Sequence, residues 1–223
     1  MTAVIAAAGS GERLGAGGPK AFVLLGRRPM IAWSLDACLA CESVTAVVVA
    51  VPAGQAHDLQ DVVTVDGGRT RAESVANALN AVDTELVAIH DAARPLLTSG
   101  LLDDLVAELL ANPGADAIIA AAPVTDTVKK VRVDFPLESN GKSTRIISDT
   151  LDRSELWGAQ TPQVFRTEAL RDALKVADAV TDEAMLIEAA GGKILVHDPG
   201  IANLKVTTPL DLRVAELLLA ERG

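Results

Sequence analysis

The sequence predicts an α/β protein with a mostly parallel β-sheet and helices on both faces. Short runs of β-branched and other apolar residues alternate along the chain with segments of helical periodicity. A glycine-rich loop directly follows the first of these runs. Strands separated by helices favour a parallel sheet, because the intervening helices cover its faces. We expect a single domain, since 223 residues are close to the size of one large α/β unit.

The strands are expected where short apolar runs are bounded by Pro, Gly or charge, at residues 2–6, 44–51, 62–65, 86–90, 117–121 and 194–197. The helices are expected where apolar residues recur with helical spacing, at residues 30–40, 72–82, 100–110, 167–177, 182–190 and 209–220. Ligands of open α/β sheets bind beyond the carboxyl ends of the strands. The chemistry is therefore expected in the loops after Ala6, Val65, His90 and Ala121.

One segment breaks this alternation and predicts a projecting antiparallel β-arm. Residues 127–133 and 143–149 resemble two strands on either side of a polar, turn-rich stretch at 138–142. An isolated two-stranded arm is marginally stable in water. We therefore expect the arm, at about residues 127–150, to be buried against a second copy of the chain.

Composition excludes several classes of partner. A formal net charge of −10 argues against binding to nucleic acid or to an anionic membrane, because both require a cationic surface. No apolar run reaches the roughly 18 residues of a membrane span, and residues 1–8 lack the features of a signal peptide. We expect a cytoplasmic protein. Cys38 and Cys41 lie in an apolar helical segment without a second cysteine pair, which favours helix packing over metal or redox chemistry.

The loop after the first strand predicts a polyphosphate site. Its small residues would let backbone N–H groups approach phosphate oxygens, and two cations in the same loop, Arg13 and Lys20, would supply positive charge. Leu14 stands where a dinucleotide-binding fingerprint needs a third glycine, and Pro19 precedes Lys20 where a Walker loop does not allow it. The small residues are Ala7, Ala8, Gly9, Ser10 and Gly11.

Asp91 is the candidate metal ligand. It follows a buried apolar strand, where an acid contributes little to stability and could hold Mg²⁺ or another divalent cation against phosphate oxygens. Alternatively, Asp91 caps the following turn or pairs with Arg94, and the two interpretations can coexist. His90 is expected to be a satisfied core residue.

A second glycine turn, at residues 66–75, predicts recognition of a base. Gly67 and Gly68 would leave room for a flat ring against the backbone, and Ser74 could contact its edge. Thr70 and Glu73 have the spacing of a helix capping box.

Further along the chain the signals are weaker when taken singly. Asp182 and Glu183 are expected at a helix start, where carboxylates interact favourably with the helix dipole. Lys205 interrupts an apolar strand pattern at residues 204–206.

Taken together, these motifs resemble those of the 2-C-methyl-D-erythritol 4-phosphate cytidylyltransferases of the non-mevalonate isoprenoid pathway. The resemblance covers essentially the whole chain. It rests on an ordered set: Ala-Ala-Gly-x-Gly-x-Arg then Pro-Lys, Gly-Gly then Arg-x-x-Ser-Val, His-Asp-Ala-Ala-Arg-Pro, Pro-Val-x-Asp-Thr, Asp-Arg-x-x-Leu-Trp, Gln-Thr-Pro-Gln, Thr-Asp-Glu-Ala and Lys-Val-Thr. Ala21 departs from the family, which usually carries Gln after Pro-Lys; this puts a hydrogen bond near the loop in doubt, not the activity.

The resemblance implies a single Rossmann-like nucleotidyltransferase domain over residues 1–223 that joins CTP to a polyol phosphate and uses Mg²⁺. Arg13 and Lys20 would stabilise charge on the α-phosphate, and Arg153 and Lys205 would hold the phosphate of the acceptor. The CTP site would be lined by Ala7, Ala8, Gly9, Gly67, Gly68, Ser74 and Ala92, with Asp91 near the magnesium, and the acceptor pocket by Arg94, Thr127 and Thr181. The family is a homodimer, and Arg153 is expected to reach the site of the partner.

Two other functions remain open. Ribitol 5-phosphate cytidylyltransferases share the CTP half of the site and differ in the acceptor. A nucleotide-binding regulator that kept the fold and lost turnover is the alternative outside the enzymes, although Lys20, Asp91, Arg153 and Lys205 together argue against it.

Overall fold

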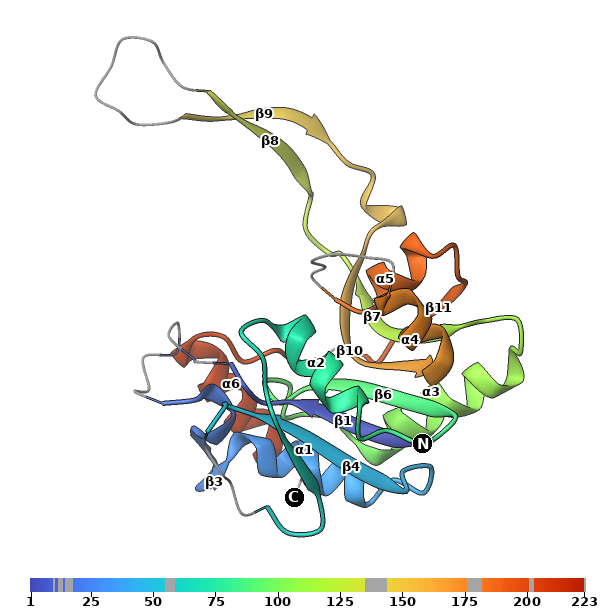
Figure 1. The fold of residues 1–223 in the computed structure, drawn as a ribbon. Helices are drawn as coiled ribbons and strands as arrows, with labels where there is room; N and C mark the ends of the chain where they lie inside the picture. The colour runs from blue at the N-terminus through green and yellow to red at the C-terminus, as the bar shows by residue number, and fades with distance from the viewer. Residues whose placement is uncertain are drawn as a thin grey trace.

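The computed structural model of the chain describes residues 1–9, 11, 14, 18–54, 59–134, 144–175, 182–200 and 203–222. Its main sheet has seven strands in the order β11-β7-β10-β6-β1-β4-β5 (Figure 1). The strands are β1 (Thr2–Ala6), β4 (Ala46–Val51), β5 (Val63–Asp66), β6 (Leu86–Asp91), β7 (Ala117–Pro123), β10 (Trp157–Arg166) and β11 (Ile194–His197). The expected α/β fold with a mostly parallel sheet is confirmed.

The register of the central strands brings their carboxyl ends to one edge. β1 pairs in parallel with β4 and with β6, and Ala6 lies opposite both Ala50 and Asp91. β5 pairs in parallel with β4, with Asp66 opposite Val51. The loops that follow β1, β5 and β6 therefore leave the sheet at the same edge.

Helices cover both faces, as expected. They are α1 (Met30–Leu39), α2 (Arg71–Leu79), α3 (Ser99–Ala111), α4 (Thr167–Leu174), α5 (Ala184–Ala189) and α6 (Pro209–Ala220). Successive residues of β1 point to opposite faces: Ala3 and Ile5 pack into a core with α1 and α3, and Val4 packs into a second core with α2, α4 and α5. Both faces of β1 are therefore buried against helices.

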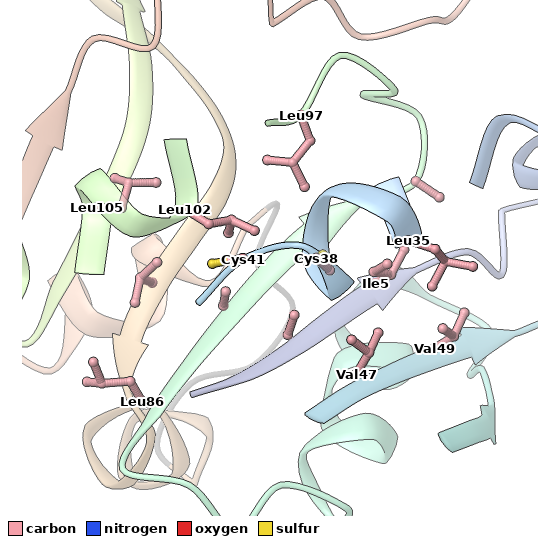
Figure 2. Packing of buried hydrophobic residues seen from close by; sticks show 14 of the residues in the cluster. Ile5, Leu35, Cys38, Cys41, Val47, Val49, Leu86, Leu97, Leu102 and Leu105 are labelled. Atoms are coloured by element: carbon pink, nitrogen blue, oxygen red, sulfur yellow. The ribbon is translucent and has the colours of Figure 1, made fainter. Parts of the chain in front are cut away.

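The first of these cores contains both cysteines (Figure 2). Burial raises the pKa of Cys38 to about 12 and that of Cys41 to about 11. Neither thiol is in a disulfide, and both side chains pack in a core with apolar residues such as Ile5 and Leu102; the Cys41 thiol also donates to Oδ1 of Asp103 over 3.2 Å. The expected packing role of the two cysteines is confirmed.

A smaller core lies under the C-terminal helix. A short hairpin, β2 (Leu24–Leu25) and β3 (Arg28–Pro29), follows the 3₁₀ turn η2 (Lys20–Phe22). Leu25 and Met30 pack there against Val206 and Ala215. Among the described residues, no helix is long and apolar enough to cross a membrane.

The sequence interpretation missed β10, the strand that makes the sheet mixed. β10 pairs antiparallel with β6 on one side and β7 on the other. Its register slips between Ala159 and Gln163, at a polar stretch that contains Pro162. Glycine, proline and glutamine in this segment suggest turns, and the strand exists because two neighbouring strands supply its hydrogen bonds.

The projecting arm is present, formed by β8 (Lys129–Asp134) and β9 (Thr144–Thr150) (Figure 1). The two strands pair antiparallel, with Lys129 opposite Thr150 and Val131 opposite Ile147. The turn-rich stretch expected at 138–142 lies outside the described residues. The arm connects to the body through the 3₁₀ turn η3 (Arg153–Glu155) on its return side.

Candidate active site

A cavity of about 640 Å³ opens at the carboxyl edge of β1, β5 and β6, where three of the four expected loops meet. Its volume is in the range of small-molecule sites. The loop after β7 leads toward the arm and is not among the lining segments. The lining comes from the N-terminal loop (Ala6, Ala7, Ala8, Gly9, Gly11, Leu14, Lys20, Ala21), the second glycine turn (Gly68, Arg69, Thr70, Arg71, Ser74), the loop after β6 (Asp91, Ala92, Ala93), and Lys205 with Thr207.

The N-terminal loop folds back on itself to bring Lys20 to the cavity. The Lys20 amide donates to the Gly9 carbonyl over 3.1 Å. Gly11 has a φ of +75°, and a Cβ at this position would lie 2.9 Å from the Cβ of Lys20. A side chain at position 11 would thus be strained and would displace the backbone that carries Lys20. Ser10 and Arg13, predicted here as phosphate-binding residues, lie outside the described residues.

The second glycine turn is packed tightly, which explains its two glycines. A Cβ on Gly67 would lie 2.4 Å from the Cβ of Ala8, and a Cβ on Gly68 would lie 2.1 Å from that of Glu73. The buried Ser74 hydroxyl accepts from the Gly68 amide and donates to the Thr70 carbonyl. Gly68 and Ser74 line the cavity, and Gly67 packs beside Ala8.

The helix that follows this turn begins as expected. The Thr70 hydroxyl accepts from the Glu73 amide over 3.1 Å, so Thr70 is the N-cap of α2. The Glu73 carboxylate turns back and accepts from the Arg69 amide over 2.7 Å. The N-cap role predicted for Thr70 is confirmed, and it fixes the direction in which the first residue of α2 points; the Glu73 carboxylate bonds the Arg69 amide, one residue before the N-cap.

Asp91 carries a negative charge held between two cations. Its Oδ1 accepts from Nε of Arg71 over 2.9 Å, and its Oδ2 accepts from Nζ of Lys205 over 2.6 Å. Burial opposes ionisation of this carboxyl, but Arg71 and Lys205 outweigh burial and hold the pKa of Asp91 well below its usual range. The partners of the carboxylate are therefore Arg71 and Lys205, and not Arg94, whose amide bonds the Asp91 carbonyl.

Arg71 also binds a second carboxylate. Its Nη1 donates to both oxygens of Glu183, over 2.6 and 2.5 Å, and the Glu183 side chain is 1% exposed. Burial lowers the pKa of Arg71, but Asp91 and Glu183 raise it more, and the guanidinium stays charged. Glu183 is the N-cap residue of α5 but makes no side-chain capping bond. Asp182 and Glu183 thus lie at the start of α5, as expected, but the Glu183 carboxylate bonds Arg71.

Sequence reasoning quoted Arg71 and Glu183 without giving either a role at the site. They are 112 residues apart in the chain. One signal could have indicated the pair: Arg71 is the first residue of α2, directly after its N-cap, where the helix dipole disfavours a cation. An arginine at that position indicates an anionic partner.

A closed chain of hydrogen bonds supports the strand end below Asp91. The Thr161 hydroxyl accepts from the Asp91 amide and lies 3.3 Å from Nδ1 of His90. Nε2 of His90 lies 3.1 Å from the Arg94 carbonyl, and Nη1 of Arg94 donates to the Asn203 carbonyl. Nδ2 of the Asn203 side chain donates to the Thr161 carbonyl over 2.9 Å, which closes the chain of bonds. His90 is thus the satisfied core residue that was expected.

Lys205 is brought to Asp91 by irregular backbone. Residues 203–207 form no strand, contrary to the expected strand pattern at 204–206. The Val206 amide donates to the Ala93 carbonyl over 2.8 Å, and the Val206 side chain is fully buried beneath α6. The backbone bond of Val206 and the burial of its side chain together place the adjacent Lys205 beside the loop that follows β6.

Three more of the predicted residues, Arg94, Thr127 and Arg153, are not among the residues that line the cavity of their own chain. Arg94 is buried and is not among the lining residues. Thr127 is exposed near the base of the arm. Arg153 is also exposed there, and its Nη1 bonds the Thr125 carbonyl. Thr181 lies outside the described residues.

The residues at Asp91 fit a metal that is bound together with a phosphate ligand. Among the described residues, no group of three or more His, Cys, Asp or Glu side chains could form a protein-only metal site. Mg²⁺ is commonly held by one or two carboxylates together with substrate phosphates. Asp91 is ionised and lines the cavity, so it can supply one such carboxylate.

Comparison with known proteins identifies the family. Residues 1–221 match the model of the 2-C-methyl-D-erythritol 4-phosphate cytidylyltransferase family. The chain belongs to this family. A curated member from Parasynechococcus marenigrum is 42% identical, covering 100% of this chain and 99% of that protein. Another, from Frankia casuarinae, is 40% identical, covering 99% of this chain and 81% of that protein.

Solved structures of the cytidylyltransferase family share the fold. The crystal structure of the cytidylyltransferase from Thermus thermophilus aligns with a TM-score of 0.79 and 31% identity, over 98% of each chain. A bifunctional enzyme from Campylobacter jejuni aligns with a TM-score of 0.78 and 29% identity, over 96% of this chain and 53% of that one. This chain thus corresponds to one part of the bifunctional protein.

Proposed function

We propose that the chain transfers the cytidylyl group of CTP to 2-C-methyl-D-erythritol 4-phosphate and releases pyrophosphate. The observation that carries this proposal is the concentration of cations around one cavity of an acidic chain. Lys20, Arg71 and Lys205 line the cavity together with Asp91, although the formal net charge is −10. Two polyanionic reactants repel each other, and such local positive charge offsets that repulsion.

In this reaction an oxygen of the acceptor phosphate attacks the α-phosphorus of CTP, and the bond to the β-phosphate breaks. Lys20, with Arg13, would stabilise the charge that builds on the α-phosphate. Lys205 would hold the acceptor phosphate in line for attack. The small residues of the N-terminal loop allow the triphosphate to lie against the backbone, and Gly68 and Ser74 would border the cytosine. Positioning and charge compensation are the main requirements of such transfers.

Asp91 would hold Mg²⁺ together with phosphate oxygens of CTP. The metal would supply charge neutralisation to the triphosphate. Arg71 and Lys205 each occupy one lone-pair direction of the Asp91 oxygens, and a carboxylate has about four such directions. The carboxylate can therefore keep contacts to its cations while it contributes a metal ligand.

We further propose that the arm forms a homodimer. Val131, Val133 and Ile147 are 49%, 49% and 60% exposed, and Val131 lies directly opposite Ile147 on the same face of the hairpin. An isolated hairpin with such an exposed apolar face is marginally stable in water, and packing against another surface would stabilise it. A second arm supplies one, and this arrangement would carry Arg153 to the cavity of the partner, since it lies outside its own.

Replacing both Val131 and Ile147 by Asp should produce a monomer, because the charges would be buried in the arm interface. Light scattering after gel filtration measures the mass, and pyrophosphate release measures the accompanying loss of turnover. Leu217→Asp is the matched control, since Leu217 is 68% exposed on α6. A wild-type chain that is monomeric at micromolar concentration would contradict the arm dimer.

The function is tested by pyrophosphate release from CTP, with and without Mg²⁺. The expected result is Mg²⁺-dependent release with 2-C-methyl-D-erythritol 4-phosphate and much slower release with D-ribitol 5-phosphate. The reverse preference would assign the chain to the ribitol phosphate enzymes. Binding of CTP without release with either acceptor would indicate a nucleotide-binding regulator. The cytoplasmic location expected from the sequence stays a prediction.

A further inference from the structure

Glu183 is a buried acid at the start of α5, and its side chain makes no capping bond to that helix. The capping bond at the start of α5 comes from the preceding residue: Oδ1 of Asp182 accepts from the Met185 amide over 3.1 Å. Both oxygens of Glu183 instead accept from Nη1 of Arg71, which lies on α2 and is 112 residues away in the sequence. A carboxylate that is 1% exposed is costly to bury. Its position therefore requires an explanation beyond local structure.

The geometry of Arg71 supplies that explanation. Its guanidinium is a rigid plane that bonds Glu183 through Nη1 and Asp91 through Nε. Without Glu183, the bond to Asp91 would be the only one holding the long arginine side chain among the residues that the structure describes. With it, the guanidinium is fixed at two points, and Oδ1 of Asp91 is fixed in turn. Lys205 restrains only the other oxygen, Oδ2.

Charge balance leads to the same conclusion. Arg71 and Lys205 are the two cations of this cluster, and Asp91 and Glu183 are its two carboxylates. Burial raises the pKa of Glu183, and the Arg71 guanidinium opposes that rise. Because Glu183 takes up part of the positive charge of Arg71, less of that charge acts on Asp91, and the Asp91 carboxylate stays available to a cation in the cavity. Removal of the Glu183 charge would leave two cations competing for Asp91.

We infer that Glu183 is a positioning residue, which acts through Arg71 to fix the orientation and the available charge of Asp91. The contact also joins α5 to the first turn of α2, and thus to the turn that borders the nucleotide side of the cavity. This inference rests on the proposed cytidylyl transfer, in which Asp91 faces the triphosphate.

Glu183→Gln tests the inference with almost no change in side-chain shape. The amide cannot neutralise Arg71, so kcat should fall on the order of tenfold to a hundredfold, the cost of a misplaced group at a reacting centre. The KM for the acceptor should change much less than kcat. Glu188→Gln is the matched control, because Glu188 is an exposed glutamate on the same helix. A Glu183→Gln chain that is folded and has wild-type kcat would overturn the inference.

A double-mutant cycle separates positioning from general stability. If Glu183 acts only through Arg71, Glu183→Gln should lower kcat no further in an Arg71→Gln background. The melting temperature should behave differently: Arg71→Gln leaves a buried carboxylate unpaired and lowers it, and the added Glu183→Gln should restore part of the loss. Additive losses of kcat would overturn the inference.

Thermal unfolding of the four chains does not depend on activity, so it also separates the two proposals. If the wild-type chain releases no pyrophosphate, the proposed function fails. Even then, restored stability in the double variant would show that the two side chains are coupled. If the double variant is no more stable than Arg71→Gln, the coupling itself is refuted.

Discussion

Lys20 lines the cavity, and its amide bonds the Gly9 carbonyl close to Gly11, which has a positive φ. Its position was expected from the sequence, since the lysine follows a glycine-rich loop after the first strand. If Lys20 stabilises the α-phosphate in the transition state, Lys20→Ala should lower kcat by about two orders of magnitude or more, the cost of one preorganised charge contact. Pyrophosphate release under saturating CTP measures this. Near-normal turnover in a folded variant would remove Lys20 from the chemistry.

His90 lies next to the charged site and yet stays neutral. Burial lowers its pKa from 6.5 to about 4. An unfolded chain takes up a proton on this histidine as the pH falls below about 6.5, whereas the folded chain does so only near 4. Below pH 6.5 the unfolded state therefore binds more protons, and the contribution of His90 to stability is lost as the pH falls through this window.

Two measurements check this prediction. The free energy of unfolding from urea titrations should decline between pH 6.5 and 4, with carboxylate titrations adding to the decline at the acid end. The NMR signals of the His90 ring should keep the pattern of a neutral imidazole at pH 5. A ring that titrates near pH 6.5 in the folded chain would contradict the lowering of the His90 pKa by burial.

At the scale of elements, two helix starts offer a matched comparison. Thr70 caps α2 and Thr98 caps α3, each by accepting from the amide three residues on, over 3.1 and 3.2 Å. Replacing either by Ala should cost about 1 kcal/mol in the free energy of unfolding. Only the α2 start borders the cavity. Thr70→Ala should therefore also raise the KM for CTP, and Thr98→Ala should not. Equal kinetics in the two variants would mean that the first turn of α2 does not contact the nucleotide.

The elements that sequence reasoning predicted are those whose pattern is local. The first strand and the last helix have the predicted bounds, because an unbroken apolar run forms one and a capped, amphipathic run forms the other. β10 was not predicted, because Gly158 and Pro162 interrupt its pattern. Its strand conformation depends on β6 and β7, which lie far from it in sequence.

The site shows the same division. Lys20 and Asp91 were recognised from their own neighbours, a glycine loop and a buried strand. The bond between Asp91 and Lys205 spans 114 residues, and only the family resemblance brought these two into one site beforehand. An arginine directly after an N-cap indicates an anionic partner for Arg71, but nothing local identifies Glu183 as that partner. Long-range pairs of this kind are not visible in spacing or periodicity.

At the scale of the whole molecule, the arm is continuous with two inner strands of the main sheet. β7 and β10 are antiparallel neighbours, with Pro123 opposite Trp157. The Val124 amide continues the pairing by donating to the Leu156 carbonyl, and the Leu151 amide donates to the Val128 carbonyl just before β8 and β9 begin. The projection is thus an elongated β-hairpin whose base is part of the main sheet.

Because of this continuity, the length of the arm can change without a change in the main sheet or the cavity. Removing or adding facing residue pairs along β8 and β9 would shorten or lengthen the ribbon and leave the alignment of Pro123 with Trp157 unchanged. Variants of this chain can therefore extend β8 and β9 to different lengths, and hence bring them against different surfaces, without rebuilding the cavity beside β1 and β6.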